Sequence, residues 1–341
     1  MVTNAYLKWL SGTASFWWND SAVLSGMDEA IANGATGVTT NPPLVQRSLF
    51  AAPDFWRPYL QGAKGLKGDE KIEEIIRSVT VEIAKKFEPV FKSTNGAQGY
   101  VCAQVNPNLQ GDADKMFEQG KRLTSWAPNI ALKLPATAAG IEVMEEAAAI
   151  GLTTVGTVSF TTPQAVEIAR RQQLGRERAR KAGIKPGAAF SVIMVGRIDD
   201  YLRDVAHDMR SSVKESDIIQ AGTACIKRAQ AICKERGYES CLMPAGMRGA
   251  YHAVALAGVD MTMSIAANIQ AMIEKETEHV EHYTEPVSKD VIDRLMTIPE
   301  FVRAYESDGL KPSEFITFGT TQRTLSTFIE AGWAPIGEFE V

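Results

Sequence analysis

Eight short apolar segments, most of them separated by longer helical patterns, recur along this chain and limit the folds that it can adopt. They span residues 15–20, 36–41, 100–106, 129–136, 152–159, 189–196, 239–246 and 259–265. Strands that alternate with helices are typical of βαβ units and a parallel sheet. Eight such strands predict a closed (β/α)8 barrel, or TIM barrel, of the α/β class. Because their spacing is irregular, the pattern alone leaves an open, doubly wound sheet as an alternative.

The rest of the chain fits one barrel with helical additions. It has 341 residues, and α/β barrels of this size form single domains. We predict one barrel domain over residues 1–341, with extra helices before the first strand and residues 285–341 as a C-terminal helical extension packed on the barrel. Residues 313–333 indicate a late turn and helix there. The clearest helical patterns between strands cover residues 71–87, 140–150 and 252–259.

Composition excludes several classes of protein. Apolar residues make up 45% and charged residues 23%, which is ordinary for a globular protein. The formal net charge of −5 gives no sign of a nucleic-acid partner, and no segment reaches the roughly 18 apolar residues of a membrane span. The basic run from Arg170 to Lys181 is typical of a solvated helix face. No motif calls for a metal.

The N-terminus and the cysteines indicate a cytoplasmic protein. MVTNAYLKWL lacks the charged start and long apolar run of a signal peptide. The four cysteines show no C-x-x-C spacing, so we expect free thiols in a reducing compartment.

Lys133 stands in the middle of an apolar strand, IALKLPAT, where lysine is rarely buried. Alternation along the strand turns Ile130, Leu132 and Leu134 toward the helices. It turns Ala131 and Lys133 toward the barrel axis, near the carboxyl end of the strand, where barrel active sites lie. A neutral amine there could attack a carbonyl and form a Schiff base. A lysine paired with an acid inside the barrel, or one that reaches water, fits the strand equally well.

Other strand ends carry polar side chains that the barrel would bring to the same mouth. They are Asp20, Asn41, Gln104, Thr157, Arg197 and Arg248. Two guanidinium groups suit a clamp for a phosphate, sulfonate or carboxylate. Each residue also has an ordinary explanation taken alone. Asp20 could cap a helix, Asn41 could be a turn residue, and Thr157 suits any strand.

Four segments resemble the transaldolase family of class I, Schiff-base aldolases. They are GVTTNPPL (37–44), ALKLPAT (131–137), GLTTVGTVSFTTPQA (151–165) and VGRIDDY (195–201). The first resembles the Thr-Thr/Ser-Asn-Pro signature of that family, and the second resembles the segment of its imine-forming lysine. The similarity runs from about Asp20 to about Ile265.

The resemblance implies a set of residue roles. Lys133 would form the imine, Asp20 would act as acid and base, and Thr157 would hold a catalytic water. Asn41 and Thr39 would bind substrate near the imine. Arg197 and Arg248 would bind the distal anion of the sugar. A ketose would leave a dihydroxyacetone unit on the lysine, and an aldehyde would accept it. No cofactor is needed, because the imine is the electron sink.

Three positions depart from the family pattern. Gln104 replaces the glutamate that is usual in transaldolases and matches the glutamine of the fructose-6-phosphate aldolase branch. The chain thus shares features with both branches of the family. Met194 replaces an aromatic residue of the pocket wall. Gly246 replaces a serine that often helps to hold the phosphate. The last change leaves room for a sulfonated or unphosphorylated sugar.

Several alternatives therefore stay open. We expect transfer of the unit from a sugar phosphate, or a sulfonated analogue, to an aldehyde. An enzyme that releases dihydroxyacetone, as fructose-6-phosphate aldolase does, is the first alternative. A non-catalytic sugar-phosphate-binding barrel is another, and an isomerase or epimerase is a third. The partners would be small molecules, with no nucleic acid and no membrane. The resemblance implies a homo-oligomer, since the family includes dimers and larger rings.

Overall fold

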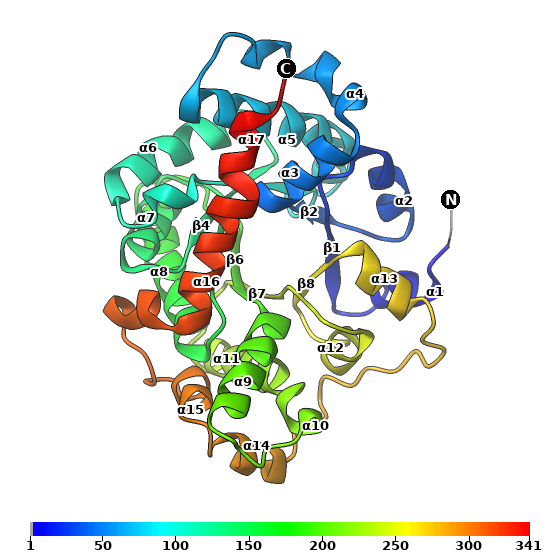
Figure 1. Ribbon diagram of the computed structural model, residues 1–341, viewed down its shortest axis with the longest axis vertical. Coiled ribbons are helices and arrows are strands. Elements are labelled where there is room, and N and C mark those ends of the chain that lie inside the picture. Colours follow the sequence, from blue (N-terminus) through cyan, green and yellow to red (C-terminus); the bar gives the residue numbers. More distant parts are fainter. Residues whose placement is uncertain (1–2) are drawn as a thin grey trace.

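The computed structural model describes residues 3–341, and its centre is a single sheet of eight strands (Figure 1). The strands are β1 (Phe16–Asp20), β2 (Gly37–Thr39), β3 (Tyr100–Gln104), β4 (Ile130–Pro135), β5 (Thr154–Thr157), β6 (Ala189–Ile193), β7 (Cys241–Pro244) and β8 (Thr262–Ile265). All eight predicted strands are confirmed, with somewhat shorter bounds.

The sheet is a barrel and not an open sheet. Its strands are parallel and lie in the order β7-β6-β5-β4-β3-β2-β1-β8, so strands that follow one another in sequence are mostly neighbours. A parallel bridge from Leu242 of β7 to Met261, just before β8, joins the two edges. The predicted (β/α)8 TIM barrel is confirmed, and the doubly wound alternative is wrong because such a sheet would keep its two edges apart.

Helices surround this sheet in Figure 1 and also extend the chain beyond it. The α-helices are α1 (Ala5–Leu10), α2 (Met27–Ala32), α3 (Pro42–Ala51), α4 (Pro53–Trp56), α5 (Gly68–Ser93), α6 (Ala113–Thr124), α7 (Ala138–Ala149), α8 (Thr162–Lys181), α9 (Val195–Asp208), α10 (Glu215–Ile218), α11 (Ala221–Glu235), α12 (Ala250–Leu256), α13 (Ala267–Ile273), α14 (Lys289–Leu295), α15 (Pro299–Tyr305), α16 (Gly319–Phe328) and α17 (Ala334–Glu338). Shorter helical turns are η1 (Leu24–Gly26), η2 (Arg57–Tyr59), η3 (Gln61–Ala63), η4 (Pro107–Leu109), η5 (Pro312–Thr317) and η6 (Ile329–Trp333).

Polar caps start several of these helices directly after a strand. The side chain of Asn41 accepts a hydrogen bond from the backbone of Leu44 at the start of α3. Thr137 and Thr161 cap α7 and α8 in the same way. A cap satisfies one of the free N–H groups of the first turn and so favours a helix that begins there. These short connections keep the polar ends of the strands close to the barrel mouth.

The two faces of β4 point as its alternation predicts. Ile130, Leu132 and Leu134 belong to the core between the strands and the helices. Ala131 belongs to a second apolar cluster, which fills the inside of the barrel together with aromatic side chains. Among these, Trp18 lies 4.7 Å from Phe190 between ring centroids. The barrel is therefore closed by side chains below Lys133 and is not a pore.

The chain extends beyond the barrel at both ends. Helix α1 precedes β1, and α14 to α17 follow β8 and its neighbour α13. In Figure 1, α16 and α17, drawn in red, cross the face of the barrel and lead to a C-terminus near α4 and α5. Trp333 donates a hydrogen bond of 2.8 Å from Nε1 to Asp69 of α5. The predicted extra terminal helices are confirmed, including the turn and helix within residues 313–333.

The basic run on α8 forms ion pairs with acidic neighbours. Arg170 and Arg171 pair with Glu167, and Arg178 pairs with Glu146 of α7. The side chains are partly exposed, so the run is a solvated helix face whose charge is largely balanced. Of the helices within residues 3–341, none is long and apolar enough to cross a membrane.

Candidate active site

Lys133 lies inside the barrel and is only 6% exposed. Its Nζ donates a hydrogen bond of 3.1 Å to the backbone carbonyl of Thr40, in the loop after β2. In the part of the chain that the structure describes, no carboxylate forms an ion pair with it. The lysine is thus held by a carbonyl and not by a direct ion pair, although the charge of Asp20 lies in the same cavity.

Asp20 ends β1 and shares the same site. Its carboxylate accepts a hydrogen bond of 3.0 Å from Oγ1 of Thr39. Burial raises the pKa of this carboxyl, and the nearby charge of Lys133 and the bond from Thr39 offset only part of that effect. Asp20 is not a helix cap, because Val23 caps the next helical turn, η1, and Gly26 caps α2. A carboxyl with a raised pKa suits proton transfer near neutral pH.

A cavity of about 320 Å³ opens at the carboxyl ends of the strands. Eight of the nine predicted site residues line it: Asp20, Thr39, Asn41, Lys133, Thr157, Met194, Arg197 and Arg248. Its volume lies at the lower end of the usual range for small-molecule sites. Residues that are widely separated in the sequence are therefore brought together at one mouth, as a barrel requires.

Gln104 is the predicted residue that does not line this cavity. It ends β3 and pairs in register with Lys133 on β4. Its side chain is buried, and Oε1 has no hydrogen-bond partner among residues 3–341. Buried polar atoms are normally satisfied, so an acceptor left open beside the lysine is consistent with a bound water or substrate group.

Asn41 combines a structural position with a place in the cavity. Its Oδ1 accepts the hydrogen bond of 2.9 Å that caps α3, which leaves the Nδ2 amide for the cavity. Asn41 is thus the N-cap of α3 and not a simple turn residue. Thr157, at the end of β5, is almost fully buried and lines the cavity as well.

Ser264 is a lining residue that the sequence analysis missed. Its hydroxyl shares a short hydrogen bond with Oγ1 of Thr39, so Ser264, Thr39 and Asp20 form one connected chain. The signal was present in the strand VDMTMSI. There Met263 and Ile265 face the helix side, and alternation turns Ser264 inward at the carboxyl end.

Arg197 lies near the start of α9, which follows β6 and is preceded by Met194. Its Nη1 donates a hydrogen bond of 3.4 Å to Thr324 of α16. Burial, followed by the positive charge of Arg248, lowers the pKa of its guanidinium. Among residues 3–341, no carboxylate forms an ion pair with this partly buried side chain.

Arg248 is exposed and held in place by two groups. It pairs with Asp200 at 2.7 Å, and its Nη1 donates to the carbonyl of Gly246 at 2.8 Å. Gly246 has a φ of 60°, a left-handed conformation that a side chain would strain. The glycine therefore fits the backbone geometry of this loop, which turns Arg248 toward Arg197.

Three other residues of the cavity wall carried no sequence signal. Arg47 belongs to α3, Asn268 to α13, and Phe328 to α16. None lies at the end of a strand, so the pattern of strand ends could not identify them. Among residues 3–341, no three His, Cys, Asp or Glu side chains gather in a way that could hold a metal ion.

The fold and the cavity define a barrel with a buried lysine and a partly buried acid at the carboxyl ends of its strands. Comparison with known families places this barrel more narrowly. Residues 17–318 match the family described as transaldolase/fructose-6-phosphate aldolase. The chain belongs to that family, and the predicted enzyme of the transaldolase or aldolase type is confirmed at this level.

Individual relatives are similar only at moderate identity. Transaldolase 1 of Streptomyces avermitilis is 27% identical over 283 residues, which cover 80% of this chain and 73% of that protein. Transaldolase 2 of the same organism is 30% identical over 173 residues, or 48% and 45% of the two chains. A transaldolase of Thiobacillus denitrificans is 26% identical over 200 residues, or 56% and 54%. The match thus spans only about half the length of several relatives.

Proposed function

We propose that this protein transfers a dihydroxyacetone unit from a ketose to an aldehyde through a Schiff base at Lys133. The observation that carries the proposal is the buried amine, 6% exposed and without a carboxylate partner among residues 3–341, in a cavity that also contains Asp20. Membership of the transaldolase/fructose-6-phosphate aldolase family supports it.

The chemistry follows from the two groups. The amine of Lys133 adds to the ketone carbon, and loss of water leaves a protonated imine. Asp20 then accepts the proton of the hydroxyl group on the carbon beyond the bond that breaks. An aldehyde leaves, and the electron pair of the broken bond moves to the imine and forms an enamine. Addition of a second aldehyde to the enamine, with return of the proton, forms the imine of the new ketose. Water then hydrolyses this imine, which releases the ketose and frees the amine of Lys133.

Water must leave and return during this cycle, and Thr157 with Gln104 would position it. Thr157 lines the cavity, and the open acceptor of Gln104 lies on the strand next to Lys133. Glutamine can orient a water but cannot accept its proton. Proton transfer would therefore depend on Asp20, whose pKa is raised by burial.

The remaining wall residues would bind the sugar. Asn41, Thr39 and Met194 line the cavity around the position of the imine, and Ser264 holds Thr39. Arg197 and Arg248 would bind an anionic group at the far end of the substrate.

Release of dihydroxyacetone to water is the second candidate function. Gln104 favours it, because the sequence resembles the fructose-6-phosphate aldolase branch at this position. The names of the relatives described above, each a transaldolase, favour transfer. Homo-oligomer formation, a cytoplasmic location and a single domain over residues 1–341 stay predictions.

An activity assay with matched variants tests the proposal. Fructose 6-phosphate is supplied with and without glyceraldehyde as acceptor, and both products are quantified. We expect Lys133→Met to lower turnover at least about 1,000-fold, because the nucleophile is lost. Lys64→Met, which removes an exposed lysine, serves as the control and keeps full turnover.

The same assay separates the alternatives. Turnover that requires glyceraldehyde indicates transfer, and turnover without it indicates release. A non-catalytic binder would bind the sugar phosphate equally well with and without Lys133 and convert none. An isomerase would take up solvent deuterium without releasing an aldehyde. Unchanged turnover in Lys133→Met would contradict the proposal.

A further inference from the structure

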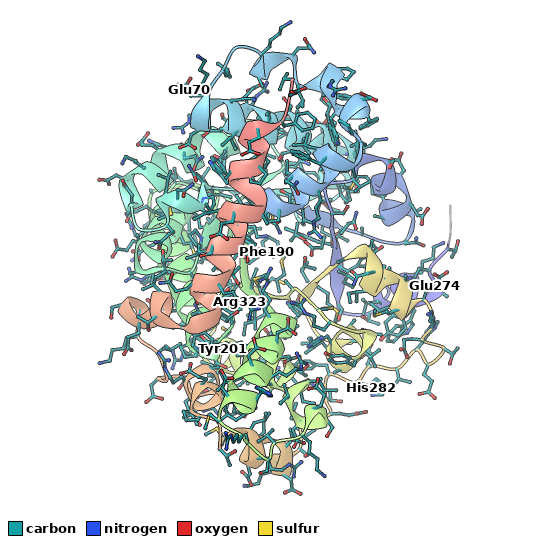
Figure 2. The ribbon with its side chains drawn as sticks, in the orientation of Figure 1. Glu70, Phe190, Tyr201, Glu274, His282 and Arg323 are labelled. Atoms are coloured by element: carbon teal, nitrogen blue, oxygen red, sulfur yellow. The ribbon has the colours of Figure 1, made fainter. Side chains whose placement is uncertain are left out.

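A buried acid and a buried histidine lie behind the wall of the active-site cavity. Asp199 of α9 and His252 of α12 are both 0% exposed, and Nε2 of His252 lies 2.9 Å from Oδ2 of Asp199. Tyr201, labelled in Figure 2, lies two residues further along α9 and is only partly buried, so Asp199 faces the inside of the helical layer. Replacing such a pair by apolar residues is often neutral for stability, so its presence calls for another explanation.

Each member of the pair is also bonded to the backbone of another element. Oδ1 of Asp199 accepts a hydrogen bond of 2.8 Å from the backbone N–H of Gly222, in the first turn of α11. Nδ1 of His252 accepts one of 3.3 Å from the backbone N–H of Arg248. In Figure 1, α9, α11 and α12 lie next to β7. One chain of hydrogen bonds thus runs from α11 through α9 and α12 to the loop after β7.

These partners determine which ring nitrogen of His252 carries the proton. A backbone N–H can only donate, so Nδ1 must be an unprotonated acceptor. The proton of the neutral ring then lies on Nε2 and points at the carboxylate of Asp199. That carboxylate accepts from His252 on one oxygen and from Gly222 on the other. The ring is therefore held in a single tautomer and a single orientation.

The loop that this ring contacts forms part of the cavity wall and packs closely on α9. Gly246 and Arg248 both line the cavity. A Cβ atom on Gly196 of α9 would lie 2.4 Å from the carbonyl oxygen of Gly246, so the two backbones touch. The ion pair of Arg248 with Asp200 is partly exposed, and such pairs hold a side chain only weakly. The bond from the Arg248 backbone to His252 instead holds the loop from its buried side.

We propose that Asp199 and His252 are positioning residues, which fix the backbone of Arg248 and so preorganise one end of the active-site cavity. His252 touches no substrate and acts only through the N–H of Arg248. A loop that must first be ordered costs binding free energy, so loosening it should raise the Michaelis constant and leave kcat nearly unchanged. That Arg248 contacts a substrate rests on the proposed function, whereas the orientation of the ring does not.

Nitrogen NMR of the intact protein with labelled histidine tests the ring without any turnover. The chain has four histidines, and the signals of His252 are those that disappear in His252→Asn. At mildly alkaline pH we predict an unprotonated Nδ1 and a protonated Nε2, which differ widely in chemical shift. A proton on Nδ1, or averaged signals from a ring that exchanges between its two tautomers, would overturn the proposal.

Two amide variants separate positioning from stability. His252→Gln places its amide near the position of Nε2, so it keeps a donor for Asp199 and loses the acceptor for Arg248. His252→Asn places its amide near Nδ1, so it keeps that acceptor and leaves the buried Asp199 without its partner. We expect His252→Gln to raise the Michaelis constant for fructose 6-phosphate about 5-fold, as for one lost hydrogen bond. His252→Asn should raise it less but melt at the lower temperature of the two.

A purely structural role, such as a helix cap, predicts that binding follows stability, and that order in the two variants would overturn the proposal. His207→Gln, at a histidine that is 89% exposed, is the control and should change neither quantity. The affinity for inorganic phosphate, measured by calorimetric titration, should weaken in the same order and needs no turnover. If Lys133 forms no imine but the phosphate affinity follows this order, only the proposed function fails. If the imine forms but the Michaelis constant is unchanged in His252→Gln, only this inference fails.

Discussion

At the scale of single residues, the site depends on two titratable groups, Lys133 and Asp20, that lie largely inside the barrel. Lys133 and Asp20 end up in one cavity although β4 and β1 are not neighbours in the sheet. Burial makes the ionised form of Asp20 costly, and this outweighs the attraction of Lys133. Asp20 is therefore suited to proton transfer, but its ionised form lowers the stability of the folded protein.

The effect of Asp20 on stability has a definite dependence on pH. Its pKa is higher in the folded chain than the value of about 3.9 expected in an unfolded one. Its contribution is therefore most favourable below the unfolded pKa and is lost as pH rises through the folded pKa. We expect Asp20→Asn to melt at a higher temperature than the unsubstituted protein at about pH 7.

That gain should shrink as the pH falls toward about 3, because Asp20 is then neutral in both states. Asp208→Asn, a change at an exposed aspartate, should shift the melting temperature little at either pH. Turnover of Asp20→Asn should fall about 100-fold or more, as expected for loss of a general base. A lower melting temperature for Asp20→Asn at neutral pH would show that the attraction to Lys133 outweighs burial.

Most residues of the candidate site could be predicted from their positions at the ends of the predicted strands. Alternation placed Lys133 on the inner face, and the barrel topology gathered the residues at the other strand ends around it. Ser264 satisfied the same rule and was overlooked. Gln104 follows the rule in its position at the end of β3, but its buried side chain is not part of the cavity lining.

At the scale of elements, the strands were predictable and the path of the C-terminal extension was not. A buried parallel strand leaves a local pattern, whereas the direction of α16 across the barrel depends on contacts between distant parts of the chain. Phe328 reaches the active-site cavity only because of that direction. Hence no local signal in residues 313–333 could have identified it.

The extension is attached to α5 by few polar contacts, so one change can test its contribution. Trp333→Phe keeps the buried ring but loses the hydrogen bond to the carboxylate of Asp69. We expect the free energy of unfolding to fall by about 1–2 kcal/mol, as for other bonds to charged groups. Chemical denaturation measures the change.

Trp9→Phe is the matched control for this prediction. Trp9 is half-buried and stacks on His279 at 5.4 Å, but its indole N–H donates no hydrogen bond among residues 3–341. Its substitution should therefore cost less stability than that of Trp333. An equal or larger cost for Trp9→Phe would mean that the bond to Asp69 contributes little to holding the extension.

At the scale of the whole molecule, the barrel and the C-terminal extension both contribute residues to the site. The barrel provides the amine, the acid and the hydroxyl groups from its strand ends. The extension crosses the face of the barrel and adds Phe328 to the wall of the cavity. The central claim is that the assembled site makes a covalent imine with a ketose at Lys133.

Borohydride trapping of the intact protein tests this claim most directly. The protein is incubated with fructose 6-phosphate, reduced with borohydride, digested and mapped by mass spectrometry, with Lys133→Met treated in parallel. We predict a reduced dihydroxyacetone adduct on Lys133, and none in the variant. If no adduct forms on Lys133 with fructose 6-phosphate or with unphosphorylated and sulfonated ketoses, the Schiff-base account is contradicted.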